Sequence, residues 1–163
     1  MKVEPIIMKP IGAIRTPFKT LEGMPIQPVG APQVEGRVVV DPSYADGLAD
    51  IEGFSHLILI YAFHRSRGFD LKVKPFLDDH VRGLFATRAP RRPNPIGLSV
   101  VTLLRREGNI LHVGNIDVVD GTPLLDIKPC VPAFDAPAVT AIGWLEGKVQ
   151  QSRDMRSDTR FKK

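Results

Sequence analysis

The sequence has a single cysteine, Cys130, and no long apolar run. One cysteine cannot close a disulfide within the chain, as is usual for proteins of reducing compartments. The longest apolar run, Leu57 to Phe63, is far shorter than the roughly 20 residues that a membrane-spanning helix needs. The first ten residues, MKVEPIIMKP, place a proline and a glutamate where a secretory signal needs an apolar core. We therefore expect a cytoplasmic protein with no membrane association.

The sequence also lacks two common phosphate-binding motifs and shows no pattern of metal-binding residues. Neither GxGxxG nor GxxxxGK[ST] occurs, so the usual glycine loops for dinucleotides and nucleoside triphosphates are excluded. The histidines are scattered, and the adjacent residues Asp78, Asp79 and His80 cannot easily all face one ion. We expect no bound metal.

What is present suits one folded domain. The chain has 163 residues, of which 43% are hydrophobic and 25% charged, enough to bury its own core. We predict this domain over residues 1–149. The remaining residues 150–163 alternate charges without apolar periodicity, which predicts a polar, flexible tail that is either simply solvated or in contact with RNA. The net charge of +4 permits an anionic partner without demonstrating one.

Short apolar segments separated by Gly, Pro, Asn and Asp predict an all-β fold, a single closed or nearly closed β-barrel. The expected strands are Met8–Ile14, Gly36–Val40, Phe54–His64, Leu84–Arg88, Ile96–Leu104, Asn109–Val119 and Leu124–Pro129. Helix is limited to minor short pieces, and Ser43–Ile51 is the only candidate of note.

The stretch RAPRRPNPIG, which begins at Arg88, places three arginines and three prolines before an apolar strand. Proline fixes φ and biases the preceding residue toward extended backbone, so no helix forms here. A stiff loop loses less entropy when its arginines bind a ligand. We interpret the stretch as a functional loop, since polar, pre-shaped loops at strand ends often carry sites; a solvated loop with scattered charge is the alternative.

Alternation in FSHLILIYAFH places Leu57, Leu59 and Tyr61 on one strand face and His56 and His64 on the other. We expect His56 to be a hydrogen-bonded core histidine. For His64, at the strand end, a role in a cleft and a structural role stay equally open.

A second polar cluster, NIDVVDGTPLLDIKPC, carries Asp117, Asp120 and Asp126. Asp120 precedes a strong Gly-Thr-Pro turn signal and could simply cap that turn. Asp126 and Lys128 share a strand face and could pair with each other. A carboxylate-rich turn and an arginine-rich turn, each beside apolar strands, would together suit a zwitterionic or cationic small molecule.

The sequence resembles the TsaA-like (TrmO) family of S-adenosylmethionine-dependent tRNA (adenine-N6)-methyltransferases. The resemblance is carried by the histidine-flanked strand, by the aspartate-rich segment, and by IGAIRTPF from Ile11, MPIQPVGA from Met24 and GLFATRAPRRPNPIGLS from Gly83. The match runs from about Ile11 to Val131. It implies a β-barrel methyltransferase outside the Rossmann class, a homodimer with the cofactor near the subunit boundary, and methylation of N6 in threonylcarbamoyl-adenosine beside the tRNA anticodon. Such a fold would account for the absent glycine loop.

Transferred position by position, the resemblance implies eleven S-adenosyl-L-methionine contacts. They are Pro25, Ile26, Gln27, His64, Arg65, Arg88, Leu98, Gly114, Asn115, Ile116 and Asp117. The sequence departs from the family pattern at Cys130, where tyrosine is usual, and longer members carry a C-terminal domain beyond the matched region.

Methyl transfer from a sulfonium needs alignment rather than a metal. An adenine N6 amine is a weak nucleophile, and an oxygen that accepts one of its protons would assist it. The candidate acceptors, which the sequence does not rank, are Asp117, Asp120, Asp126 and Asn94.

For a tRNA partner we expect a basic surface spread over more than one subunit. Its predicted residues are Arg91, Arg92, Arg105, Arg106, Arg153, Arg156 and Arg160. Two other functions stay open: a non-catalytic RNA-binding barrel, and a sensor that binds S-adenosylmethionine without transferring its methyl group.

Overall fold

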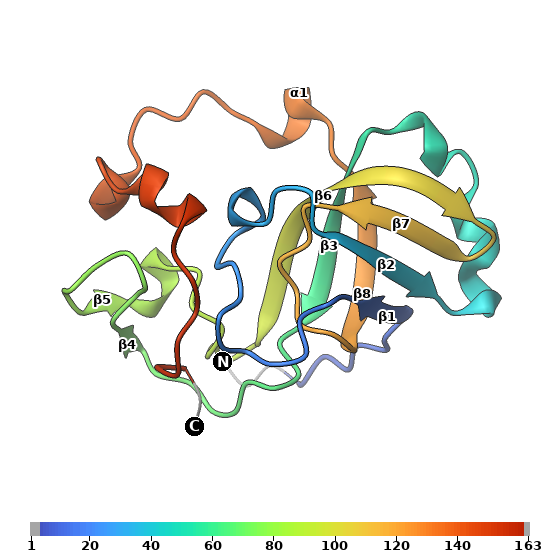
Figure 1. The fold of residues 1–163 in the computed structure, drawn as a ribbon. Helices are drawn as coiled ribbons and strands as arrows, with labels where there is room; N and C mark the ends of the chain where they lie inside the picture. The colour runs from blue at the N-terminus through green and yellow to red at the C-terminus, as the bar shows by residue number, and fades with distance from the viewer. Residues whose placement is uncertain (1–3, 162–163) are drawn as a thin grey trace.

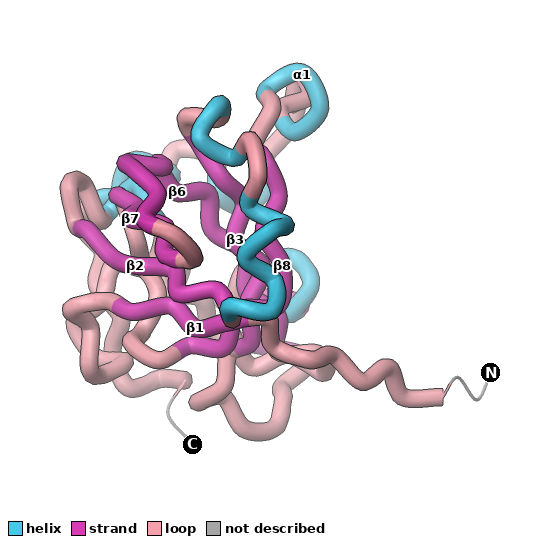
Figure 2. Tube along the Cα trace, turned by 90° about the vertical axis from the view of Figure 1, so that its right-hand side faces the viewer, coloured by secondary structure: helices cyan, strands magenta, loops and turns pink. Residues whose placement is uncertain are grey.

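The computed structural model describes residues 4–161, and its central feature is a closed six-stranded β-barrel (Figures 1 and 2). The strand order around the barrel is β1-β2-β7-β6-β3-β8, and every pairing is antiparallel. The strands are β1 (Gly12–Arg15), β2 (Glu35–Val40), β3 (His56–Ala62), β6 (Ile96–Glu107), β7 (Ile110–Gly114) and β8 (Thr122–Pro129). Closure leaves no unpaired barrel edge, and the predicted all-β barrel is confirmed.

Inward-facing side chains fill the barrel interior, and burial alternates residue by residue along β3 and the first half of β6. Leu57, Leu59 and Tyr61 of β3 point inward, and the first two are fully buried, as the alternation in the sequence predicts. The neighbouring strands contribute further fully buried side chains: Ile14, Val38, Val101, Leu111, Val113 and Leu124. His56 is an exception to the prediction, because it is exposed and bonds Ser55 at the surface rather than in the core.

The remaining elements are short. A second, two-stranded sheet pairs β4 (Lys72–Val73) with β5 (Arg82–Gly83), and the one α-helix, α1, covers Pro132–Asp135. The 3-10 helices cover Pro28–Gly30, Pro42–Leu48, Ile51–Gly53, Leu84–Ala86, Gly143–Leu145 and Val149–Arg153. The predicted strand Leu84–Arg88 is therefore wrong, since its first residues form a 3-10 turn in a loop that prolines restrict. Among the described residues, no helix is long and apolar enough to cross a bilayer.

The C-terminal segment, drawn red in Figure 1, passes between the β4–β5 hairpin and the loop that precedes β2. Arg156 forms an isolated β-bridge with Pro25, and the backbones of Ser157, Gly23 and Met24 are joined by two hydrogen bonds of 2.8 Å. Lys148 adds an ion pair of 2.8 Å to the buried carboxylate of Asp78. Residues 150–161 are thus tied to the body of the protein, which the prediction of a flexible tail did not anticipate.

Candidate functional site

One end of the barrel opens into a large cleft of about 950 Å³, which we call the main cleft. Its walls come from the loop before β2, the ends of β3 and β6, the Arg88 loop, the segment after β7 and the C-terminal segment. Most of its lining is apolar, including Met24, Phe63, Phe85 and Trp144. A few polar groups face this apolar surface, which is the usual composition of a small-molecule site.

A three-residue hydrogen-bond chain lies at the base of the main cleft. Ser99 Oγ donates to Asp117 Oδ1 at 2.6 Å, and Tyr61 Oη lies 2.9 Å from Ser99 Oγ. Because the serine has one hydroxyl proton and gives it to the carboxylate, the tyrosine must donate to the serine. Tyr61 thus donates to Ser99 and Ser99 donates to Asp117, a chain of hydrogen bonds that stabilises the anionic form of the carboxyl.

Asp117 is half-buried and has no ion pair among residues 4–161. Burial raises the pKa of its carboxyl to about 6, against the lowering effect of the bond from Ser99. A carboxyl with this pKa exchanges a proton near neutrality, which is the property of a general base. Burial, together with the charge of Asp117, likewise raises the pKa of Tyr61, so the phenol keeps its proton.

The arginine-rich loop contributes a fixed wall. Arg88 is exposed at the rim and donates to the Gln27 side chain at 2.9 Å. Arg92 donates to the carbonyls of Thr87 and Ala89, and its guanidinium lies over the ring of Phe85 at 5.6 Å. Arg88 and Arg92 thus line the main cleft. Arg88 lies at the rim, where a ligand could contact it, and Arg92 stabilises the loop.

His64 stands at the rim with a defined tautomer. Thr122 Oγ1 donates to the Val119 carbonyl at 2.8 Å and lies 3.3 Å from His64 Nδ1. Because the threonine proton is already used, His64 Nδ1 must carry the proton of this contact. Partial burial and nearby Arg65 lower the pKa of His64, so the ring is neutral and its Nε2 offers a lone pair.

The structure brings eight of the eleven predicted cofactor contacts to the main cleft: Pro25, Ile26, Gln27, His64, Arg65, Arg88, Leu98 and Asp117. The other three do not line it. Ile116 is fully buried in the barrel core, the side chain of Asn115 bonds Gln33 and Thr102, and Gly114 belongs to β7. The residues that follow Asp117, namely Val118, Val119 and Thr122, line the cleft instead. Two valines and a threonine beside a turn gave no signal of this in the sequence.

The other predicted proton acceptors lie away from the main cleft. Asp120 accepts from the backbone of Thr16 and pairs with Lys19 at 2.9 Å. Asp126 pairs with Lys128 at 2.9 Å, as its strand position suggested. Asn94 is exposed and does not line the cleft. Asp117 is the one member of the four at the site.

The predicted RNA-contact arginines are mostly engaged within the chain. Arg91 is 8% exposed and pairs with Asp70 at 3.1 Å, so its charge faces inward. Arg105 pairs with Glu107, and Arg106 bonds the Leu48 carbonyl. Arg160 pairs with Asp158, and Arg156 bonds backbone carbonyls of its own segment. Arg153 is exposed. The part of the chain that the structure describes holds no cluster of three or more His, Cys, Asp or Glu side chains placed to bind a metal.

Comparison with known proteins agrees with this architecture. The family model for the tRNA-methyltransferase O N-terminal domain matches residues 13–136. A probable S-adenosyl-L-methionine-binding protein of Pyrococcus abyssi is 53% identical over 156 residues, which cover 96% of this chain and 85% of that protein. The tRNA (adenine(37)-N6)-methyltransferase of Escherichia coli strain K12 is 40% identical over 132 residues. This match covers 75% of the present chain and 56% of the bacterial enzyme.

The likeness extends to three dimensions. The crystal structure of TrmO from Pseudomonas aeruginosa superposes with a TM-score of 0.73 at 38% identity, over 86% of this chain and 63% of that one. The matched region includes the barrel strands and the segments that carry Tyr61, Ser99 and Asp117. From the family match, the identities and the shared barrel, the chain belongs to the TrmO N-terminal-domain family.

Proposed function

We propose that the protein is an S-adenosylmethionine-dependent methyltransferase that acts on N6 of an adenosine in tRNA, with threonylcarbamoyl-adenosine beside the anticodon as its substrate. One observation favours this function most: Asp117, a half-buried carboxylate without an ion pair in the described chain, faces a mainly apolar cleft and has a pKa raised to about 6. A carboxylate that only stabilised the fold would be expected to have a cationic partner.

The residues of the main cleft fit S-adenosylmethionine. Its apolar walls suit an adenine ring, and exposed Arg65 and Arg88 offer guanidinium groups to a carboxylate of the ligand. The negative charge of Asp117 suits a cleft that accepts a cationic ligand. When bound, S-adenosylmethionine supplies an electrophilic methyl group on a sulfonium, and transfer of this group depends on alignment rather than on a metal or a glycine loop.

The role of the protein's own residues is to accept one proton from the N6 amine. Transfer would break the sulfonium–methyl bond, with the neutral thioether S-adenosylhomocysteine as leaving group, and form a nitrogen–carbon bond at N6. The methylated amine would then release one proton, which Asp117 would accept. Ser99 and Tyr61 hold the carboxylate in place and stabilise its charge before the reaction. Because the pKa of Asp117 is near 6, the carboxylate is ionised at neutral pH and remains basic enough to take the proton.

A homodimer is part of this proposal. The outer face of β6 exposes a row of apolar side chains, with Ile96, Leu98, Val100 and Leu104 between 37% and 52% exposed. Leu98 also lines the main cleft, so a second copy on this face would border the ligand. Sedimentation velocity should give the mass of two chains, and a monomer would contradict this part of the proposal. A cytoplasmic location stays a prediction.

The function is tested by incubating the protein with labelled S-adenosylmethionine and total tRNA from a strain that lacks the activity, followed by nucleoside analysis. The wild type should label an N6-methylated adenosine. Asp117→Asn should lose this activity, whereas the matched Asp126→Asn should keep it, because Asp126 lies on the barrel away from the cleft. Binding of S-adenosylmethionine without transfer to any tRNA would support a sensor, and RNA binding without cofactor affinity would support a plain RNA-binding barrel.

A further inference from the structure

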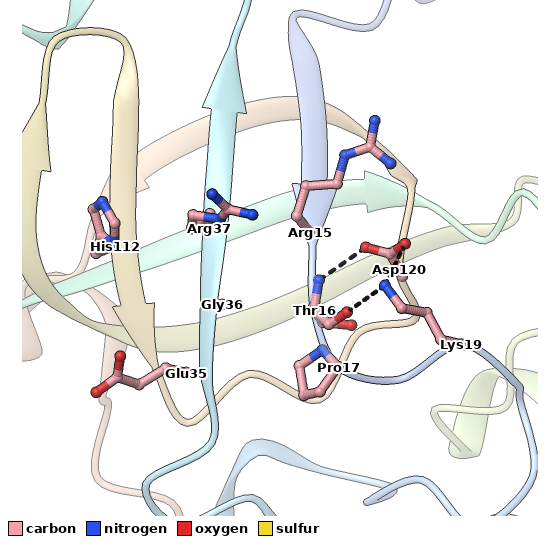
Figure 3. A pocket seen from close by; sticks show the side chains of 9 residues that line it. All are labelled: Arg15, Thr16, Pro17, Lys19, Glu35, Gly36, Arg37, His112 and Asp120. Atoms are coloured by element: carbon pink, nitrogen blue, oxygen red, sulfur yellow. Dashed lines mark hydrogen bonds and ion pairs between the residues drawn. The ribbon is translucent and has the colours of Figure 1, made fainter.

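A second cavity, of about 400 Å³, lies on the outer wall of the barrel over β1, β2 and β7 (Figure 3). We call it the arginine pocket, because Arg15 and Arg37 are its most prominent cations. Lys19 and His112 add nitrogen groups to its lining, and Glu35 and Asp120 add carboxylates. None of these residues belongs to the lining of the main cleft.

Strand register places the basic side chains in one row. Arg15 of β1 is directly opposite Arg37 of β2, and Arg37 is directly opposite His112 of β7. On its other side His112 is opposite Arg105 of β6. Four nitrogen-bearing side chains thus cross four neighbouring strands, about 4.8 Å apart from one strand to the next. Glu107 already pairs with Arg105 at 2.8 Å and lies 3.3 Å from His112 Nε2, so the unmatched part of the row is the directly opposite pair Arg15 and Arg37. Like charges in directly opposite positions destabilise a sheet, so this pair favours an anion.

Arg15 and Arg37 differ from Arg91, Arg105 and Arg160, each of which pairs with a carboxylate. Within residues 4–161 neither guanidinium makes a hydrogen bond or an ion pair, and both side chains are exposed. Neither carboxylate of the pocket pairs directly with them: Asp120 bonds Thr16 and Lys19, and Glu35 points away from the guanidinium groups in Figure 3. The charge of Arg15 still contributes to the lowered pKa of Asp120, after the contacts from Lys19 and Thr16. The pair is therefore available to a ligand.

The arginine pocket and the main cleft share a wall. Lys19 lines the pocket, and its backbone carbonyl accepts a 2.9 Å hydrogen bond from Arg65, which lines the cleft. Asp120 lines the pocket, while its neighbours Val118 and Val119 line the cleft. A linear polyanion seated on Arg37 and Arg15 can continue over Lys19 and Arg65 to the rim of the main cleft.

We infer that the arginine pocket binds backbone phosphates of the RNA whose adenosine enters the main cleft. The inference rests on the proposed function and assigns the RNA path to residues outside the predicted set. Guanidinium forks bind phosphate through paired, charge-assisted hydrogen bonds. An RNA strand supplies successive phosphates along a line, which suits the adjacent cations Arg37, Arg15 and Lys19.

The test compares Arg15→Gln/Arg37→Gln with Lys72→Gln/Arg67→Gln, a control that removes the same charge from exposed cations lining neither cavity. Binding of total tRNA is measured by filter retention from 50 to 200 mM salt. We expect the first variant to bind roughly tenfold more weakly at low salt and to lose about 1.4 to 1.8 from the slope of log affinity against log salt, as two lost phosphate contacts require. The control should behave as the wild type.

Calorimetry with S-adenosylmethionine separates this inference from the proposed function. The Arg15→Gln/Arg37→Gln variant should keep wild-type cofactor affinity, because neither arginine lines the main cleft. Unchanged tRNA affinity and salt slope, or an equal loss in both double variants, would overturn the inference while leaving the methyltransferase proposal intact. If the wild type methylates no tRNA, the proposed function fails, and the salt slopes still decide whether the pocket binds RNA phosphate.

Discussion

Ser99 Oγ donates a hydrogen bond of 2.6 Å to Asp117 Oδ1, and this contact joins the end of β6 to the segment after β7 at the base of the main cleft. Ser99 is 1% exposed, so its proton has no competing water. Burial raises the pKa of the Asp117 carboxyl and this hydrogen bond lowers it, so that the pKa is about 6. The proposed chemistry depends on this balance.

Ser99→Ala should therefore move the acidic limb of the pH–rate profile to higher pH. The variant removes the contact that lowers the pKa of Asp117, and a charge-assisted hydrogen bond of this kind corresponds to about one pH unit. Tyr61→Phe should shift the profile in the same direction by less, because it acts through the serine. Single-turnover rates between pH 5 and 9 provide the measurement, and an unshifted limb in Ser99→Ala would show that another group sets it.

Asp117→Asn should stabilise the protein at pH 8 by about 2 kcal/mol. Folding raises the pKa of Asp117 from 3.8 to about 6, so the folded state holds a proton that the unfolded chain has released between these values. The stabilising contribution of this proton is complete below pH 3.8 and is lost as pH rises through about 6. Urea unfolding at pH 8 and pH 4 should show the gain at pH 8 only; an equal gain at both would assign it to packing.

Gly97→Ala should lower the free energy of unfolding by about 1 to 3 kcal/mol and disturb the hydrogen-bond chain. A Cβ at this position would lie 2.2 Å from Tyr61 Cε2, so the buried tyrosine ring or the backbone of β6 would have to shift. Gly83→Ala is the matched control, because a Cβ there meets nothing within 4 Å. Thermal unfolding of the two variants should differ by several degrees, and equal melting temperatures would refute the proposed contact.

Ser157→Ala should weaken S-adenosylmethionine binding severalfold with little effect on the barrel. Ser157 Oγ accepts from the Met24 backbone at 2.9 Å and donates to the Leu21 carbonyl at 2.5 Å. These bonds fix the C-terminal wall of the main cleft against the loop before β2. Thr159→Ala, at an exposed position with no such bonds, is the control for calorimetric titration. Equal affinity in both variants would mean that this wall does not contact the ligand.

The barrel could be predicted because burial alternates along β3 and the first half of β6. Leu57, Leu59 and Tyr61 follow that alternation, whereas Leu84–Arg88 has strand-like residues but lies in a loop where turn geometry decides the conformation. The position of His56 could not be read from alternation alone, because a strand's outer face is solvated wherever no second layer covers it.

Only part of the site could be predicted, because several of its contacts form between residues that are distant in the sequence. Asp117 was identified through residue type and family resemblance, but its partner Ser99 lies 18 residues away, and only the closed barrel brings the two together. Arg91 and Arg105 seemed free in the sequence, yet Asp70 and Glu107 neutralise them. Arg15 and Arg37, which have no ion pair within residues 4–161, are distant in sequence and become neighbours through strand register.

The most direct test of the account is the single-turnover rate of methyl transfer to tRNA for the wild type and Asp117→Asn between pH 5 and 8, with S-adenosylmethionine saturating. The wild-type rate should rise with pH and level off above about 6, where Asp117 is ionised. Asp117→Asn should be at least about 10²-fold slower at neutral pH and show no such rise, because the amide cannot accept the proton. A variant rate equal to the wild type, with the same dependence on pH, would contradict the role of Asp117 as proton acceptor.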